Sequence, residues 1–344
     1  MTTLLSDSID RLLADISSPE AVRAAERSGD VASIWQALEQ SGFLDALAPE
    51  NAGGAGMTLV DVFPLFLAAG RHALPAPFSQ TILVRAALAM QGHPLPQGSI
   101  VIAPSAQVGA DGVLTCRNLP YGRVAQWVVA CLPDGWLLLD AALAGRTDTG
   151  AFASLQASLK WQAPAPGWAT QPEHADMPWL EIGAAATAVD MAGALQRVLA
   201  MTVDYVNERS QFGRSIGKFQ AVQQQLSILA EQVFAARMAA QIGCTGTSIM
   251  PGGARVAMAK ARVGDAVSIC APIAHAAHGA MGVTAEYALQ LYTRRLHEGA
   301  LDYGSASYWH RRLGTMLLDG PHGTALDFML AELCPDLAES TGTG

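Results

Sequence analysis

Residues 209–220 combine basic, amide and aromatic side chains with two glycines, around one point where a helical pattern breaks. Gly213 and Gly217 interrupt a helix that is expected to run to about Gln211, so the chain must turn there. Free backbone groups at a helix end and the guanidinium of Arg209 are groups that bind anions. The pattern suits a diphosphate, and the alternative is a helix–helix connection whose charges are solvated.

Two other groups of residues could carry chemistry, and neither predicts a site. His275 and His278 have a spacing that a metal could use on a helical face, but no carboxylate or cysteine accompanies them in the sequence. We therefore expect no metal site. The five cysteines are odd in number and form no C-x-x-C pair, which favours reduced core thiols; they are Cys116, Cys131, Cys244, Cys270 and Cys334.

The periodicity of apolar residues changes twice along the chain. It is helical from about Leu4 to Gln91, and it then gives short β-rich runs from Gly98 to about Gln162. The expected strands are residues 99–103, 112–116, 127–132 and 136–140. Prolines at positions 164, 166, 172 and 178 indicate an irregular linker. Helical periodicity then returns, with expected helices at residues 183–211, 220–243, 254–279 and 286–297, a pattern typical of a bundle.

Composition limits the class of protein. The chain has 344 residues, 51% of them hydrophobic and 15% charged, and a formal net charge of −9. This acidic balance argues against nucleic-acid binding, and the low charged fraction indicates apolar surface that oligomerisation would bury. No apolar run appears long enough to span a bilayer, so we expect no membrane insertion. The first eight residues carry an acid where a signal peptide is basic, which favours a cytoplasmic location.

Four segments, in order, resemble the acyl-CoA dehydrogenase flavoprotein family. R-x-Q-F-G at residues 209–213 is followed by F-Q-A-V-Q at 219–223, which looks like the signature of the family. P-E-N-A-G-G-A-G at 49–56 and H-G-A-M-G-V-T-A-E at 278–286 resemble two further motifs. Tyr292-Thr-Arg294 resembles the end of the helix that follows, and the likeness extends over roughly residues 30–315.

The resemblance implies a mostly α fold with a small central β domain. The expected parts are an N-terminal helical domain (1–96), a β-barrel-like middle domain with its linker (97–180) and a C-terminal four-helix bundle (181–334). Residues 335–344 are expected to form a disordered tail.

The resemblance also implies a reaction, FAD-dependent removal of hydrogen from the α and β carbons of an acyl-CoA thioester, with an electron-transfer flavoprotein as electron acceptor. In the family the FAD diphosphate is commonly reached across a subunit contact by the R-x-Q-F-G and H-G-G-x-G segments. Carried over residue by residue, this implicates Arg209, Gln211, Phe212, Gln220, Gly279 and Gly282 in cofactor binding. Ala276 and Ala280 depart from the family pattern.

The base that removes the α-proton is the least certain assignment, because the family's usual carboxylates are missing. Counted without gaps from Arg294, the family's Glu-Gly pair falls on Tyr303 and Gly304, and the alternative glutamate of some members falls on Gly183. A tyrosine of ordinary pKa is only about 0.1% ionised at pH 7. Three other acids are therefore candidates: Asp302, which on a regular backbone would point elsewhere, Glu298, which would need a helix break to enter the site, and Glu181.

Three functions remain open from the sequence. The chain resembles either an active acyl-CoA dehydrogenase with an unusual base, with Tyr303 and Asp302 as candidates, or a non-catalytic subunit that completes the flavin site of a longer partner. Short members of this kind work beside a longer subunit, for example in bacterial breakdown of steroid side chains. The third possibility is a helical scaffold of the same fold without a cofactor. The oligomer could be homomeric or mixed.

Overall fold

The computed structural model describes residues 2–162, 167–169, 177–245, 250–321 and 323–333. The predicted disordered tail at 335–344, the prolines at positions 164, 166 and 172, and Cys334 lie outside these residues. The first part of the chain is helical, with α1 (Thr2–Ile16), α2 (Pro19–Ser28), α3 (Ala32–Ser41), α4 (Leu59–Arg71) and α5 (Phe78–Met90). Every residue of α5 from Phe78 to Leu88 is buried, so this helix lies between the other parts of the molecule.

Two four-stranded sheets form the middle of the chain. One has the order β1 (Ile100–Ala103), β4 (Trp127–Leu132), β5 (Gly135–Asp140), β8 (Gly167–Ala169), with β1 parallel to β4. The other is antiparallel, in the order β2 (Ala106–Val108), β3 (Leu114–Leu119), β7 (Ala157–Trp161), β6 (Gly145–Asp148). The sequence predicted β1, β3, β4 and β5 but not the other four. β6 is exposed along its length, so it carries no apolar alternation to reveal it.

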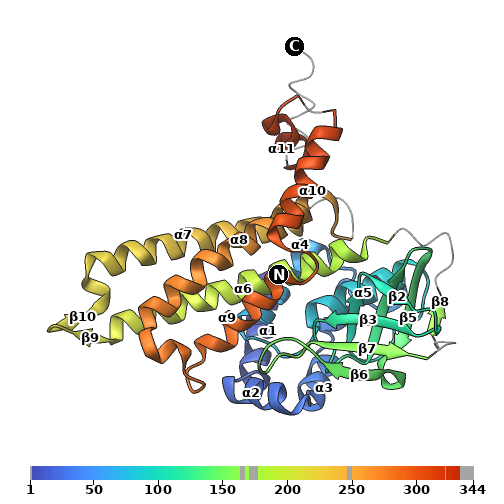
Figure 1. Cartoon of the computed structure of the whole chain (residues 1–344), viewed down its shortest axis with the longest axis horizontal. Coiled ribbons are helices and arrows are strands. Elements are labelled where there is room, and N and C mark those ends of the chain that lie inside the picture. The colour runs from blue at the N-terminus through green and yellow to red at the C-terminus, as the bar shows by residue number, and fades with distance from the viewer. Residues whose placement is uncertain (1, 163–166, 170–176, 246–249, 322, 334–344) are drawn as a thin grey trace.

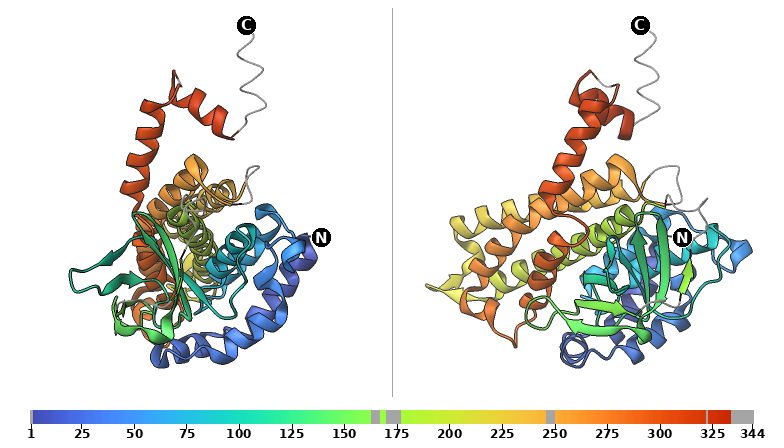
Figure 2. Two further views of the ribbon diagram at one scale, coloured as in Figure 1. Left: turned by 90° about the vertical axis from the view of Figure 1, so that its right-hand side faces the viewer. Right: turned by 45° about the vertical axis from the view of Figure 1, so that its right-hand side comes forward.

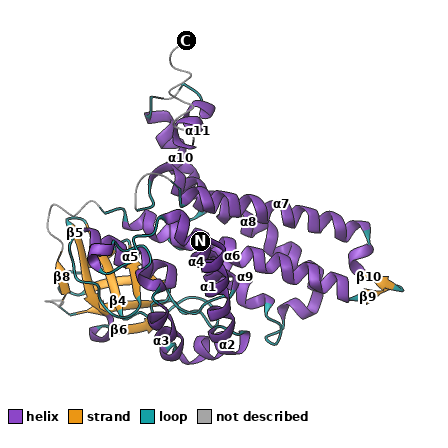
Figure 3. Ribbon diagram, turned by 180° about the vertical axis from the view of Figure 1, so that it is seen from behind, coloured by secondary structure: helices purple, strands orange, loops and turns teal. Residues whose placement is uncertain are grey.

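The C-terminal part is a helical bundle of α6 (Trp179–Glu208), α7 (Gln220–Gly243), α8 (Gly253–His278) and α9 (Leu289–Leu301). Two further helices, α10 (Ala306–Asp319) and α11 (Ala325–Leu333), project from the bundle (Figures 1 and 2). The expected mostly α fold with a small β domain is therefore confirmed. Figure 3 shows the two sheets at one end of the molecule and a small hairpin, β9 (Ser210–Gln211) and β10 (Arg214–Ser215), at the other.

Two expectations about the helices need correction. The first bundle helix ends at Glu208 rather than near Gln211, because residues 210–215 pair with each other instead of continuing the helix. In addition, one described stretch, Gly253–Val283, is long and apolar enough by composition to cross a bilayer, contrary to the expectation that no such run exists. α8 makes its main contacts with α6, α7 and α10, which is the position of a core helix in a bundle.

Candidate functional site

The segment predicted to bind a diphosphate lies at the tip of the bundle, and we call residues 209–220 the anion hairpin. Gln211 pairs with Arg214 and Ser210 with Ser215, and both residues of the connecting turn, Phe212 and Gly213, have positive φ. Phe212 is 91% exposed. The sequence thus identified a chain reversal correctly, although it is built as a two-stranded hairpin and not as a simple break between helices.

The donors of the anion hairpin face solvent. Arg209, Gln211 and Gln220 are exposed, and Gln220 is the first residue of α7. No side chain caps the N-terminus of α7, so its first backbone N–H groups and the positive end of its dipole are open to an anion. The Arg214 guanidinium instead lies 4.1 Å from the centre of the Phe219 ring, a cation–π contact within the chain. This set of donors fits a diphosphate brought from outside the chain.

The two predicted glycines lie at the same end of the bundle, where α8 leads into a 3-10 turn (Gly279–Val283). Gly279 has φ +58°, and a Cβ there would meet nothing within 4 Å, so its backbone is accessible. A Cβ on Gly282 would lie 2.9 Å from the Cβ of His278. Close packing within the chain therefore accounts for Gly282, whether or not a ligand approaches it.

Both histidines of the H-x-x-H spacing have partners within the protein. Nε2 of His275 lies 2.9 Å from Oγ1 of Thr293, and Nδ1 of His278 lies 2.8 Å from the Ala274 carbonyl oxygen. The His278 ring also stacks on Tyr205, with ring centres 4.4 Å apart. Burial lowers the pKa of both imidazoles. These contacts join the glycine turn to the last two turns of α6, just before the anion hairpin.

The two positions that the sequence predicts to correspond to the family's base lie against each other at the opposite end of α6. A Cβ on Gly183 would fall 2.4 Å from Cδ1 and Cε1 of Tyr303, so the aromatic ring occupies the space that any side chain at position 183 would need. The Tyr303 hydroxyl lies 2.8 Å from Oε1 of Gln80 on α5 and 3.0 Å from the Ile102 carbonyl oxygen on β1. Tyr303 therefore joins the bundle, the N-terminal helices and the first sheet.

These surroundings argue against Tyr303 as a base, the role that its sequence position suggested. Burial raises the pKa of the Tyr303 hydroxyl well above its usual value. The hydroxyl has one proton to donate and lies within hydrogen-bond distance of two acceptors, and its ring packs against Gly183. Both features keep it neutral and fixed, which suits a structural role.

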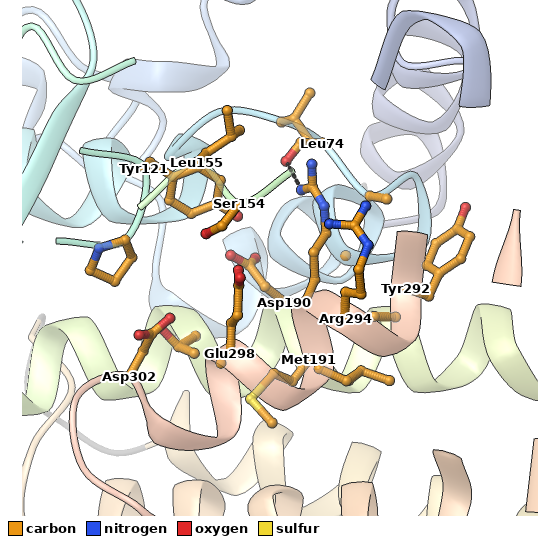
Figure 4. Close-up of a pocket in the computed structure, with 18 of the residues that line it drawn as sticks. Leu74, Tyr121, Ser154, Leu155, Asp190, Met191, Tyr292, Arg294, Glu298 and Asp302 are labelled. Atoms are coloured by element: carbon orange, nitrogen blue, oxygen red, sulfur yellow. Dashed lines mark hydrogen bonds between the residues drawn. The ribbon is translucent and has the colours of Figure 1, made fainter. Parts of the chain in front are cut away.

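Asp302 and Glu298, in contrast, face a partly open cavity of about 80 Å³ between α4, α6, α9 and the loops around Tyr121 and Ser154. Figure 4 shows the carboxyl groups of Asp190, Glu298 and Asp302 directed into it. Asp302 lies in a bend after the helix, because α9 ends at Leu301 and Tyr303 has φ +54°. Glu298 reaches the cavity from within an unbroken helix. The approach of either carboxyl group to the base position stays a prediction.

We call this cavity the acidic cavity. Two of its carboxyl groups, those of Asp190 and Asp302, have a raised pKa. Burial raises the pKa of Asp190 to about 7, against the opposing effect of its 2.6 Å hydrogen bond from Ser79. Burial also raises the pKa of Asp302 to about 7, although Lys260 acts in the other direction. Oδ1 of Asp302 accepts a 2.9 Å hydrogen bond from Gln156. Carboxyl groups with a pKa near neutrality are suited to proton transfer.

Glu26 and the two arginines beside it, which also line the cavity, form ion pairs. Glu26, 4% exposed, lies 2.7 Å from Arg294 and 3.1 Å from Arg295. Glu181, the third candidate base, is hydrogen-bonded to Arg312 of α10 and does not line the cavity. Sequence reasoning missed Asp190, Glu26 and the buried Lys260, because none belongs to a motif and each acquires its role only through packing.

Comparison with known proteins supports the family resemblance. Residues 174–300 match the family model described as acyl-CoA dehydrogenase, C-terminal domain. The chain is 30% identical over 325 residues to acyl-CoA dehydrogenase IpdE2 of Mycobacterium tuberculosis, covering 92% of this chain and 98% of that protein.

Solved structures give a similar result. The fold matches a chain in the crystal structure of the ChsE4-ChsE5 complex from Mycobacterium tuberculosis, with a TM-score of 0.80, 22% identity and coverage of 93% of this chain and 98% of that one. A chain of the Tcur3481-Tcur3483 steroid ACAD G363A variant matches with a TM-score of 0.79, 26% identity and the same coverage of both chains.

Proposed function

The chain belongs to the acyl-CoA dehydrogenase family of oxidoreductases, and from this premise we propose that it is one subunit of a mixed, FAD-dependent acyl-CoA dehydrogenase. In this proposal its anion hairpin completes the flavin site of a longer partner subunit. Its own base position, occupied by Tyr303 and Gly183, does not remove the α-proton. The assembly catalyses α,β-dehydrogenation of an acyl-CoA thioester in the cytoplasm and passes electrons to an electron-transfer flavoprotein.

One observation carries the proposal, namely the distance between the two ends of α6. Gly183 and Arg209 are 26 residues apart on one continuous helix, which corresponds to about 39 Å at 1.5 Å per residue. The ring of FAD is joined to its diphosphate by a five-carbon chain, roughly 10 Å long at ordinary bond lengths of about 1.5 Å. If a flavin ring lies at the base position of this chain, its diphosphate does not reach Arg209 of the same chain. This distance supports a flavin shared between subunits, and the choice of a longer partner rests on the neighbours that are named as pairs of proteins.

Bound FAD would supply the hydride acceptor for the β-hydrogen. For this chain, Arg209 would pair with phosphate oxygens, and Gln211 and Gln220 would add amide donors. Phe212 would offer an apolar ring beside them, and Gly279 would allow backbone approach. Two neighbours are named as pairs of proteins, the ChsE4-ChsE5 complex and the Tcur3481-Tcur3483 steroid ACAD. This supports a mixed oligomer and a steroid-derived thioester as substrate class.

The test is to express the chain alone and together with a longer acyl-CoA dehydrogenase encoded beside it, and to measure flavin absorbance per chain. We expect the lone chain to carry little flavin and to show no anaerobic bleaching by octanoyl-CoA. The co-expressed pair should co-purify with bound flavin. Full flavin occupancy and rapid bleaching with the lone chain would overturn the proposal in favour of a self-sufficient homo-oligomer.

A second function is favoured by one observation, the carboxyl of Asp302 in the acidic cavity, beside the base position. If this chain has its own active site, Asp302 is the base, and it acts in its ionised form. Bleaching of a bound flavin should then increase as the pH rises through about 7, and Asp302→Asn should slow it by 10²–10⁴-fold, the usual contribution of a positioned base. A rate that is independent of both pH and the substitution would exclude this role.

A further inference from the structure

Lys260 is the one lysine among the described residues that is fully buried, and its partners all lie on one short segment. Its Nζ donates to the carbonyl oxygens of Gly299 at 2.8 Å and Gly304 at 2.9 Å, and lies 3.5 Å from that of Ala300. These residues form the end of α9 and the bend after it, which we call the base-slot turn (residues 299–304). Lys260 itself is on α8, so it ties two bundle helices together.

The base-slot turn decides which side chain faces which space. Tyr303 and Gly304 both have positive φ, +54° and +100°, and positive φ is costly for a non-glycine residue. Through this bend Asp302 faces the acidic cavity while Tyr303 faces Gly183. On the far side, Nε1 of Trp309 donates to the Tyr303 carbonyl oxygen at 3.0 Å. Because Tyr303 is strained, the turn needs such anchors to persist.

Lys260 is well matched to this anchoring task. The last carbonyl groups of a helix have no partners within it and carry the negative end of the helix dipole, so a cation with several donors satisfies them. The arrangement is costly in another respect, because burial lowers the pKa of Lys260 to about 8, with Asp302 opposing that shift. An apolar residue would fill the same space without this desolvation. The lysine is therefore explained by its donors and charge and not by its volume.

We propose that Lys260 is a positioning residue, which holds the carbonyl groups of Gly299 and Gly304 together and thereby turns Asp302 into the acidic cavity and Tyr303 onto Gly183. The inference goes beyond the proposed function, since it concerns how the turn that carries Tyr303 and Asp302 is held. The hydrogen bonds of the Lys260 side chain are to the carbonyl oxygens of this turn, so its effect is on the orientation of the turn.

The first experiment follows Tyr303 directly. The full chain is labelled with 3-fluorotyrosine, and the signal of Tyr303 among the six tyrosines is assigned from its loss in Tyr303→Phe. In Lys260→Met, which keeps the shape but removes the donors and the charge, this fluorine signal should move and gain a solvent isotope shift in D₂O. Val256→Ala, an equally buried change on the same helix, is the control and should leave the signal in place. An unmoved Tyr303 signal in folded Lys260→Met overturns the proposal.

The second experiment does not require a lysine variant, in case Lys260→Met does not fold. The other lysines of the chain, Lys160 and Lys218, are exposed. Lysine-labelled protein should therefore give two signals from exposed lysines and one from the buried Lys260, which titrates near pH 8. Asp302→Asn should lower the midpoint of the Lys260 signal by roughly one unit, as for removal of a nearby opposite charge, and leave the other two unchanged.

An unchanged midpoint would show that the Asp302 carboxylate does not lie near Lys260, and would refute the orientation of the turn that the proposal assigns to Lys260. Both readouts are independent of flavin and of any partner subunit. If the co-expressed pair holds no flavin while both signals respond as expected, the proposed function fails and the role of Lys260 stands. If flavin is retained and neither signal responds, only the role of Lys260 fails.

Discussion

The two ends of α6 carry the two halves of the chemistry expected of this family, and they are built in opposite ways. At the C-terminal end, the anion hairpin exposes its arginine, amides and aromatic ring to solvent. At the N-terminal end, Gly183 lies under the ring of Tyr303, with 6% of that residue exposed. The first arrangement exposes groups that could bind another molecule, and the second fills the position at which the sequence resemblance predicts a carboxylate.

This difference supports the proposal that the hairpin, and not the base position, takes part in the chemistry of the assembly. Exposed polar groups in a strained two-residue turn contribute little to the stability of a single chain, so their presence is explained by a ligand or partner. The tyrosine–glycine contact contributes to the core and provides no ionisable group at neutral pH. A chain that has kept the hairpin and closed the base position matches a subunit that helps to hold a cofactor for another.

The largest expected effect is a difference in the free energy of unfolding between substitutions at the two ends of α6. Tyr303→Ala should destabilise the chain by about 3–5 kcal/mol, because it empties a large buried site and leaves the Ile102 carbonyl group without its donor. Phe212→Ala, at the exposed tip, should change stability by no more than about 0.5 kcal/mol. Chemical denaturation of the two variants beside the parent chain measures both numbers.

Equal losses from the two substitutions would break the comparison, since they would mean that the hairpin is part of the core. Tyr303→Phe sharpens it. This variant keeps the ring against Gly183 and removes only the hydroxyl, so it should cost about 1–3 kcal/mol, the range for leaving a buried partner unsatisfied. A loss of stability as large as that of the alanine variant would assign the whole effect to the hydroxyl and none to the contact of the ring with Gly183.

The same contrast explains what the sequence could predict. The hairpin residues follow each other within twelve positions, so a local motif identifies Arg209, Gln211, Phe212 and Gln220 together with the turn between them. The helices were also accessible, because α7 and α8 have long periodic patterns; the bounds of α7 match the expectation and those of α8 differ by one residue at each end. These features depend on local spacing.

The base position is different, because it is assembled from distant segments. Counting along the chain placed Tyr303 and Gly183 in the two base positions, and the structure brings them into contact. Counting could not predict that Asp302 faces a cavity, since its orientation depends on the positive φ of Tyr303, which a regular backbone would not include. Asp190 and Lys260 were missed for a related reason: their pKa shifts come from burial by α4, α5 and α9, which no local pattern reports.

The smallest expected effect is on cofactor affinity and tests the exposed end alone. Arg209→Ala should weaken FAD binding to the co-expressed pair by about 1.5–3 kcal/mol, the range for hydrogen bonds to a charged group, or roughly 10- to 150-fold in affinity. Because Arg209 is exposed, the stability of the chain itself should change by less than about 0.5 kcal/mol. Arg27→Ala, an exposed arginine of α2, is the matched control and should leave both quantities unchanged. Flavin titration of the purified pair gives the affinity, and denaturation of the lone chain gives the stability. An affinity equal to that of the parent would mean that the anion hairpin is a solvated connection between helices, and the case for a flavin shared between subunits would then lose its main support.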